Sequence, residues 1–205
     1  MQVQLYAITD RLLLPPHPGS WEAALCAQVE KWVEADVEWV QLREKNLPES
    51  TLAALVRRLA AITRRPGTRT RLLVNGLSPG PAAESGADGV HLPSGALPEG
   101  VRAAVQVAGV VTISCHTLPE VAAARKLGAS AVLWAPVFGK VVNGNLVQSG
   151  AGLPALHAAC VAASSLPVFA LGGVTVANAP ACVEAGASGV AGIRLFQGEL
   201  WRSLR

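Results

Sequence analysis

The chain has few aromatic and few charged residues. Of its 205 residues 4% are aromatic and 15% are charged, whereas 51% are apolar and the mean hydropathy is +0.37. Disordered segments and coiled coils need more charge and less apolar content, so both are excluded. The scarcity of aromatic residues argues against a stacking surface for single-stranded nucleic acid. A net charge of only +3 is too small for a protein that binds duplex nucleic acid.

The sequence also lacks the signals of a secreted or membrane protein. Its first residues do not combine a basic region with an apolar one, and no apolar run reaches the roughly 18–20 residues of a membrane span. The cysteines lie far apart and form no Cys-x-x-Cys pair, which argues against a zinc site or a disulfide framework. We therefore expect a cytoplasmic protein, without a membrane partner, in which four thiols stay reduced: Cys26, Cys115, Cys160 and Cys182.

Short apolar runs alternate with alanine-rich stretches of helical period. The runs predict strands at 3–8, 39–42, 72–75, 89–92, 110–114, 131–135, 168–171 and 189–193. Being continuously apolar, they are typical of parallel strands covered on both faces. The stretches between them predict helices at 21–34, 49–63, 78–85, 99–107, 119–126, 153–163 and 176–185, with a short one at 199–204.

One turn sequence recurs where a predicted helix meets the next strand. It occurs at 34–40 (EADVEWV), 85–90 (SGADGV), 127–132 (LGASAV) and 185–190 (AGASGV). We expect the glycine to end the helix in the left-handed conformation. Eight similar units of about 26 residues predict an α/β protein with a (β/α)8 TIM barrel, as one domain over residues 1–205. A doubly wound open sheet is the alternative.

In a TIM barrel the reactive face is formed by the loops that follow the strands. Gly172 and Gly173 follow the seventh predicted strand, and Ile193 and Arg194 follow the eighth. Glycines let backbone N–H groups approach an anion, and the start of a helix near Thr175 would add a favourable dipole. These residues predict a phosphate site, although the glycine pair could instead serve close packing of helix and strand.

Two further groups of residues stand at this face. Arg43 and Lys45, two apart on the second strand, should point the same way and suit a diphosphate, unless they pair with Glu44. His116 stands beside Ser114 after the fifth strand and is the candidate for proton transfer, unless it caps the following helix. His91 could be functional or an ordinary interior histidine. Six arginines are expected on solvated surface: Arg57, Arg58, Arg64, Arg65, Arg69 and Arg71.

Seven segments, in order over nearly the whole chain, resemble the thiamine-phosphate synthase / TenI family. They are 5–11 (LYAITDR), 40–45 (VQLREK), 73–75 (LVN), 86–92 (GADGVHL), 113–116 (ISCH), 135–138 (APVF) and 171–174 (LGGV). The resemblance implies a TIM barrel that binds a small phosphorylated thiazole or pyrimidine. It implies ligand binding by Gln41, Arg43, Lys45, Asn75, Lys140, Gly172, Gly173, Ile193 and Arg194.

The chain departs from the synthase pattern at two acidic positions. The synthase joins an aminopyrimidine diphosphate to a thiazole phosphate and releases pyrophosphate, with Mg²⁺ neutralising the leaving group. Its pattern has an acid after the asparagine of strand three, where this chain has Gly76, and another after strand four, where residues 93–96 (PSGA) have none. Mg²⁺ prefers carboxylate oxygens, so we expect no metal site and no cofactor, with Mg²⁺ needed only if the synthase interpretation holds. In the loop after strand six, Lys140 stands in a different register from the family's lysine, among Asn143, Gly144 and Asn145.

Residues 75–76 (NG) and 92–95 (LPSG) are similar to the TenI branch, which is associated with a metal-independent thiazole tautomerase. The histidine that those tautomerases carry on strand six is Pro136 here, and proline cannot transfer a proton. The leading hypothesis is therefore a TenI-like protein that binds a thiazole phosphate, with His116 and Ser114 as altered catalytic groups. The alternatives are a divergent thiamine-phosphate synthase, a non-catalytic phosphate-binding or regulatory barrel, and an unrelated phosphate-handling barrel. The sequence leaves a homodimer open.

Overall fold

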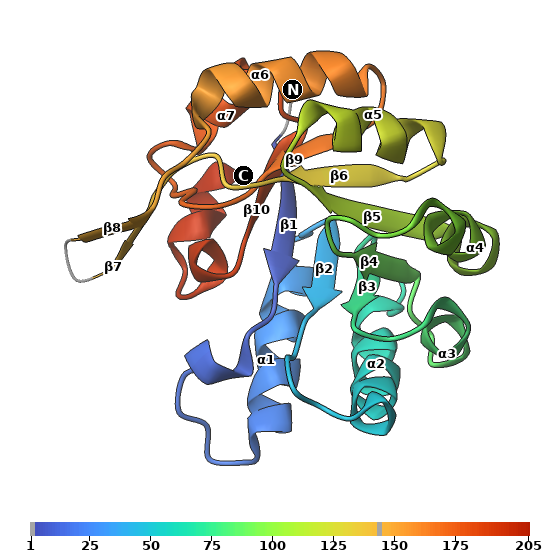
Figure 1. The fold of residues 1–205 in the computed structure, drawn as a ribbon. Coiled ribbons are helices and arrows are strands. Elements are labelled where there is room, and N and C mark those ends of the chain that lie inside the picture. Colours follow the sequence, from blue (N-terminus) through green and yellow to red (C-terminus); the bar gives the residue numbers. More distant parts are fainter. Residues whose placement is uncertain (1–2, 143–144) are drawn as a thin grey trace.

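Eight parallel strands close into a barrel (Figure 1) in the computed structural model, which describes residues 3–142 and 145–205 but not the side chains of 140–148. The strands pair in the order β1-β10-β9-β6-β5-β4-β3-β2, and β2 pairs with β1 to complete the circle. Closure confirms the TIM barrel and excludes the open sheet. The strands are β1 (Gln4–Ile8), β2 (Trp39–Leu42), β3 (Arg71–Asn75), β4 (Gly89–Leu92), β5 (Val110–Cys115), β6 (Ala131–Trp134), β9 (Val168–Ala170) and β10 (Gly189–Gly192).

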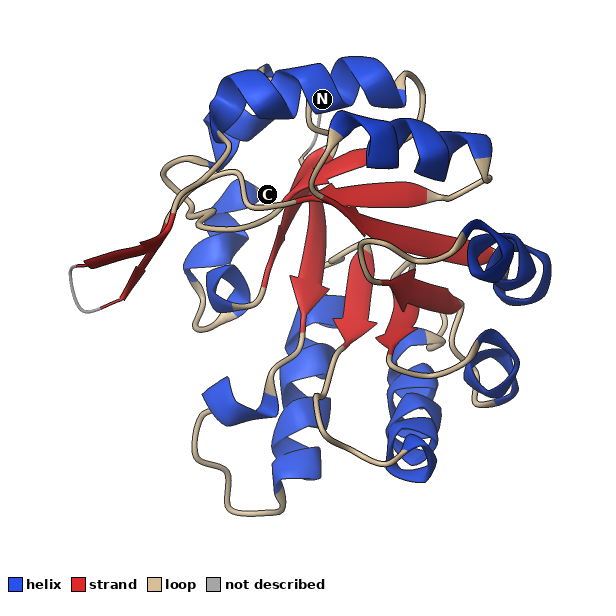
Figure 2. Ribbon diagram, in the orientation of Figure 1, coloured by secondary structure: helices blue, strands red, loops and turns tan. Residues whose placement is uncertain are grey.

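Helices surround the barrel (Figure 2). They are α1 (Trp21–Glu34), α2 (Glu49–Thr63), α3 (Pro79–Glu84), α4 (Pro98–Ala108), α5 (Leu118–Lys126), α6 (Gly152–Ala163) and α7 (Ala179–Glu184). The predicted start of α7 at residue 176 is wrong, because Thr175 and Asn178 bond to each other's backbone N–H groups and hold the preceding residues in a turn. The last predicted helix is instead a short 3-10 helix, η3 (Leu200–Leu204).

The loop after β6 contains an antiparallel hairpin that the sequence analysis treated only as a polar loop. Its strands are β7 (Lys140–Val142) and β8 (Asn145–Gln148), and it projects away from the barrel (Figure 1). Two further 3-10 helices, η1 (Arg11–Leu13) and η2 (Arg194–Phe196), follow β1 and β10. All three additions lie at the carboxyl ends of strands, where the predicted site residues stand.

Three of the chain's few aromatic side chains fill the inside of the barrel. The ring of Tyr6 stacks on Trp39 at 5.9 Å and meets Phe169 edge-on at 5.3 Å, and Trp39 lies 5.7 Å from Phe169. All three are buried together with the aliphatic side chains of Ile8, Leu73, Ala131, Leu133 and Ala191. Alternate residues of each strand point inward and the others pack against the helices, so the strands are buried on both faces.

The recurrent turn has the backbone conformation that its glycine predicts. Gly86, Gly128 and Gly186 have φ of 96°, 84° and 100°, and in the first copy Asp36 takes the left-handed conformation with φ of 55°. The polar residue after the glycine then bonds to the neighbouring strand. Asp88 Oδ2 accepts a hydrogen bond from the backbone N–H of Leu72 at 2.8 Å. The turn therefore both ends the helix and fixes the start of the next strand.

A second glycine of this turn begins a barrel strand where there is no room for a side chain. A Cβ at Gly189 would lie 2.1 Å from the carbonyl oxygen of Gln4 on β1. At Gly89 it would lie 1.9 Å from the carbonyl oxygen of Val110 on β5. Gly189 thus allows the last strand to approach the first closely enough to close the barrel.

The cysteines form no disulfide with one another, as expected, and Cys115 and Cys182 are buried. Burial raises the pKa of the Cys115 thiol to about 12. Among the helices of the described residues, none has the length and apolar character that crossing a membrane requires.

Replacement of Gly189 by alanine tests the closure of the barrel. We expect Gly189→Ala to lower the free energy of unfolding by at least about 2 kcal/mol, because the new methyl group must push β10 from β1. The control is Gly100→Ala in α4, where a Cβ has nothing within 4 Å and where we expect a gain of about 0.4–1 kcal/mol. Urea denaturation measures both. Equal stability of Gly189→Ala and the wild type would contradict the close approach.

Candidate functional site

A cavity of about 470 Å³ opens at the carboxyl ends of β9, β10 and β1. The loop after β9 lines it from Leu171 to Thr175, and β10 with the residues after it lines it from Ala191 to Leu195. Asp10 and Leu13 enclose it from the loop after β1, and Pro136, Phe138 and Gly139 from the loop after β6. Four of the predicted ligand-binding residues therefore line one cavity: Gly172, Gly173, Ile193 and Arg194.

The glycine pair in this cavity is needed for packing as well. Both residues are left-handed, with φ of 93° at Gly172 and 66° at Gly173. A Cβ on Gly172 would lie 2.8 Å from Pro136, and one on Gly173 would lie 2.7 Å from the Cβ of Phe138. The alternative of close packing thus holds, with the loop after β6 in place of a helix as the neighbour. It does not compete with ligand binding, because the same glycines also line the cavity.

Backbone N–H groups are available around the cavity. Those of Gly173, Val174, Ile193 and Arg194 have no acceptor among the described residues, whereas the N–H of Thr175 donates to Asn178 Oδ1 at 2.8 Å. Unpaired N–H groups of two adjacent loops, with the exposed Arg194 beside them, are suited to an anion. Helix α7 adds little, since it has six residues and begins only at Ala179.

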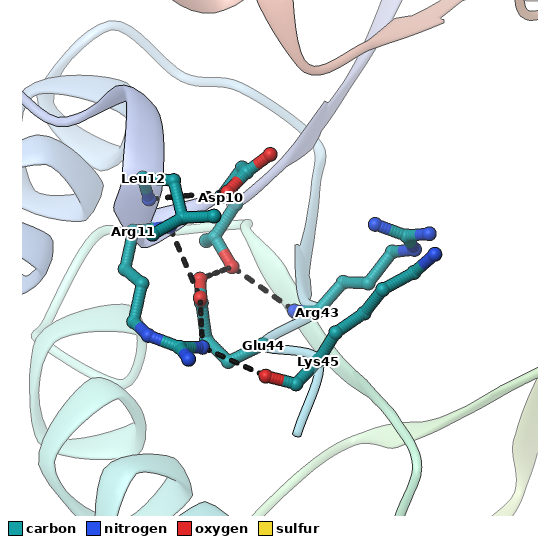
Figure 3. Close-up of polar contacts among 7 residues, drawn as sticks. Asp10, Arg11, Leu12, Arg43, Glu44 and Lys45 are labelled. Atoms are coloured by element: carbon teal, nitrogen blue, oxygen red, sulfur yellow. Dashed lines mark hydrogen bonds and ion pairs between the residues drawn. The ribbon is translucent and has the colours of Figure 1, made fainter. Parts of the chain in front are cut away.

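Arg43 and Lys45 stand at the same face of the barrel, after β2. The prediction that they lie on the strand is wrong, because β2 ends at Leu42 and both residues are in the loop. Their side chains nevertheless extend side by side in one direction (Figure 3). In the described part of the chain neither has a carboxylate partner within ion-pair distance. Two cationic side chains are therefore available to a ligand.

Glu44 does not neutralise them, because its buried carboxylate is used elsewhere (Figure 3). Glu44 Oε1 accepts a hydrogen bond from the hydroxyl of Thr9 at 2.6 Å. Glu44 Oε2 accepts from the backbone N–H and the guanidinium of Arg11, at 3.0 Å and 3.3 Å. The hydroxyl oxygen of Thr9 in turn accepts from the N–H of Arg43 at 3.0 Å. Glu44 thus links the loop after β1 to the loop after β2, and through Thr9 it fixes the position of the Arg43 backbone.

A chain of polar side chains crosses the inside of the barrel. The hydroxyl of Tyr6 donates to Gln41 Oε1 at 3.1 Å and lies 3.1 Å from Thr112 Oγ1. Thr112 Oγ1 lies 2.9 Å from His91 Nδ1, and His91 Nε2 lies 2.9 Å from Ser114 Oγ. Gln41 and His91 are buried, and Ser114 is half-buried at the end of β5. His91 is therefore an interior histidine, bonded at both ring nitrogens.

His91 is kept neutral by its surroundings. Burial, and secondarily the charge of Arg43, lower its pKa to about 4. The amide of Asn75, which is half-buried, donates to the carbonyl oxygen of His91 at 3.1 Å. Asn75 therefore contacts the backbone of β4.

The side chain of His116 bonds to Ala135 and not to Ser114, which bonds to His91 instead. The ring of His116 is exposed, and its Nδ1 donates to the carbonyl oxygen of Ala135 at 2.5 Å. Its backbone N–H donates to Glu120 Oε2 at 2.7 Å, within the capping of α5. The backbone of His116 thus takes part in capping, while its Nε2 has no partner in the part of the chain that the structure describes.

The loop after β6 contains Lys140, one of the predicted ligand-binding residues. The side chains of Lys140 and Asn145 are outside the described part of the structure, and so are residues 143–144, which include Asn143. Sequence reasoning missed Tyr6 and Thr112 as members of the interior chain. Thr112 lies two residues before Ser114 on one strand, so the alternation of side chains could have placed both inside the barrel.

The residues present do not fit a carboxylate-bound Mg²⁺ ion. After β3 and β4 stand Gly76 and Ser94, and the hydroxyl of Ser94 donates to Glu120 Oε1 at 2.8 Å. Desolvation acts to raise the pKa of Glu120, but hydrogen bonds from His116, Ser94 and Thr117 outweigh it and lower that pKa. Within residues 3–142 and 145–205 no three His, Cys, Asp or Glu side chains are grouped to hold a metal.

The low pKa of His91 has a consequence for stability. An unfolded histidine has a pKa near 6.5, so between pH 6.5 and pH 4 the unfolded state binds more protons than the folded state. We expect the free energy of unfolding to be undiminished above pH 6.5 and to fall by up to about 3 kcal/mol as the pH drops through 4. Urea denaturation at several pH values measures this dependence. The same pH dependence in His91→Gln would contradict it.

Comparison with known proteins agrees with the fold and with the predicted resemblance. The family model described as "Thiamine monophosphate synthase" matches residues 5–196. A Geobacter sulfurreducens protein, named provisionally as a thiamine-phosphate synthase, is 39% identical over 91% of this chain and 83% of its own length. The thiamine-phosphate synthase of Methanoculleus marisnigri is 34% identical over 97% of this chain and 90% of its own length.

A solved structure is similar over almost the whole chain. The thiamine phosphate pyrophosphorylase from Pyrococcus furiosus superposes with a TM-score of 0.76 and 26% identity, covering 99% of this chain and 92% of that one. The matched segment 5–196 runs from β1 to η2 and includes every loop that lines the cavity. The chain belongs to the thiamine monophosphate synthase family.

Proposed function

We propose that this protein is a thiamine-phosphate synthase, which joins an aminopyrimidine diphosphate to a thiazole phosphate and releases pyrophosphate. The relatives' names support this alternative better than the TenI-like tautomerase that the sequence analysis placed first. The observation that carries the proposal is the presence of two separate anion-binding features at one face. One is the cavity with its unpaired N–H groups, and the other is the pair Arg43 and Lys45.

The two features match the two substrates in charge. The cavity between β9 and β10 suits the single phosphate of the thiazole, held by the N–H groups of Gly173 and Ile193 and by Arg194. Arg43 and Lys45 suit the diphosphate, because a guanidinium fork and an ammonium group together offset several negative charges. β1 lies between β10 and β2 around the barrel, so a single strand would separate the two bound anions.

The reaction needs positioning and charge stabilisation more than proton transfer. The thiazole ring nitrogen forms a bond to the methylene carbon of the pyrimidine, and the bond from that carbon to the diphosphate oxygen breaks. The electron pair of the broken bond leaves with pyrophosphate, and the thiazole nitrogen becomes positively charged. Arg43 and Lys45 would stabilise the negative charge that develops on the leaving group. Gln41 and Asn75 would contact the substrates from the interior wall of the barrel.

An assay with both substrates, with and without Mg²⁺, tests the synthase proposal. We expect pyrophosphate release only when both substrates are present, and a rate about 10²–10³-fold lower in Arg43→Ala, because one charge stabiliser of the leaving group is removed. Arg57→Ala, on the exposed face of α2, is the matched control and should keep the wild-type rate. Saturable binding of thiazole phosphate without turnover would favour a non-catalytic barrel instead.

The tautomerase remains a second candidate because of the geometry of His116. The carbonyl of Ala135 accepts from Nδ1, which leaves Nε2 as the basic nitrogen, and Ala135 is followed by Pro136 in the cavity wall. If the chain is a tautomerase, we expect His116→Ala to lower its rate about 10²–10⁴-fold. The control is His157→Ala, an exposed histidine that also contacts a carbonyl through Nδ1. An unchanged rate in His116→Ala would remove this histidine from the mechanism.

A further inference from the structure

We propose that Gln41 and Tyr6 are positioning residues that orient the hydroxyl group of Ser114 from the far end of the interior polar chain. They act through Thr112 and His91, by deciding which ring nitrogen of His91 carries the proton. The proposal rests on the proposed function only where turnover is measured.

The interior polar chain consists of four hydrogen bonds between five side chains. They join Gln41 to Tyr6, Tyr6 to Thr112, Thr112 to His91 and His91 to Ser114, at 3.1, 3.1, 2.9 and 2.9 Å. Tyr6 lies on β1, whereas Thr112 lies on β5 across the barrel, so the chain spans the interior. All its members except Ser114 are buried, which leaves Ser114 as the end that meets the open face.

Counting the hydrogens available for these bonds shows which group donates in each bond of the interior polar chain. Tyr6, Thr112, neutral His91 and Ser114 each carry one hydrogen for the four bonds. In the structure the first bond runs from the hydroxyl of Tyr6 to the carbonyl oxygen of Gln41. Thr112 must then donate to Tyr6, His91 must donate to Thr112 through Nδ1, and Ser114 must donate to His91 Nε2. The hydrogen of Ser114 is thus used inside the barrel.

The opposite direction would need Gln41 to present its amide N–H2 group to Tyr6 in place of the carbonyl oxygen. Every bond would then reverse, His91 would carry its proton on Nε2, and the hydroxyl of Ser114 would be free to donate toward the ligand. Burial favours neutral His91, since its pKa is lowered to about 4, so a histidinium with both nitrogens protonated does not interrupt the chain near neutral pH. The group that Gln41 presents to Tyr6 therefore decides whether the hydroxyl of Ser114 donates to His91 or is free to donate toward a ligand.

The direction present makes Ser114 a hydrogen-bond acceptor at the open face. Its oxygen keeps lone pairs but has no hydrogen to offer, so it suits an N–H donor and disfavours a phosphate oxygen.

Nitrogen NMR of the histidine rings tests the proposal without any substrate. In wild-type protein at pH 7 we expect His91 to carry its proton on Nδ1. In Tyr6→Phe, Thr112 loses its acceptor and turns its hydrogen to His91, so the proton should move to Nε2. Gln41→Leu should cause the same change, since Tyr6 then loses its acceptor at Gln41 and donates to Thr112. Assignment of the His91 signals is made with His91→Gln.

A matched control separates this effect from a loss of packing or stability. Thr70→Val removes another buried hydroxyl, which donates to the carbonyl of Val37 at 2.7 Å outside the chain, and should leave the His91 signals unchanged. Where turnover is measured, Tyr6→Phe should lower kcat about tenfold, the effect of one hydrogen bond, with a smaller change in the KM for thiazole phosphate. A proton on Nε2 in the wild type, or on Nδ1 in folded Tyr6→Phe and Gln41→Leu, overturns the proposal. Absence of turnover with the expected NMR result overturns only the proposed function.

Discussion

The pairing of the last strand with the first is the constraint on which the site depends. β10 lies against β1 because Gly189 has no side chain where the carbonyl of Gln4 approaches. Closure places the loops after β9, β10, β1 and β2 next to one another, although they come from opposite ends of the chain. The N–H groups and the cationic side chains of the candidate site belong to these loops, and the cavity is lined by the first three of them together with the loop after β6. Without closure they would be separate segments.

The charged side chains at this face have two roles: some hold the loops together, and others are available to bind a ligand. Glu44 is buried and is bonded to Thr9 and Arg11, so it holds two loops together, and among the described residues Arg43 and Lys45 have no carboxylate partner. Glu120 is likewise used at the start of α5 by its backbone and side-chain partners. The carboxylates therefore serve the framework, whereas the cations remain for a ligand. This division is consistent with phosphorylated substrates and with a face that does not group carboxylates for a metal.

The barrel interior is also divided in two. One part is filled by the rings of Tyr6, Trp39 and Phe169. The other part contains the polar chain, in which the hydroxyl of Tyr6 is connected to Ser114 through Thr112 and His91. Tyr6 therefore belongs to the core through its ring and to the candidate site through its oxygen. A buried polar chain of this kind is stable only when every member has a partner, which restricts each of its residues to few alternatives.

The sequence by itself determined the barrel, because apolar runs and helix-ending glycines act locally and each predicted strand boundary lies within one residue of the observed one. It also placed Gly172, Gly173, Ile193 and Arg194 on neighbouring strand ends. Only the tertiary structure decided which polar side chains meet. Ser114 bonds to His91 and not to the nearby His116, and Glu44 bonds to Arg11 and not to its neighbours Arg43 and Lys45. Such pairs depend on closure of the barrel and on side-chain direction, which bring together residues that are distant along the chain.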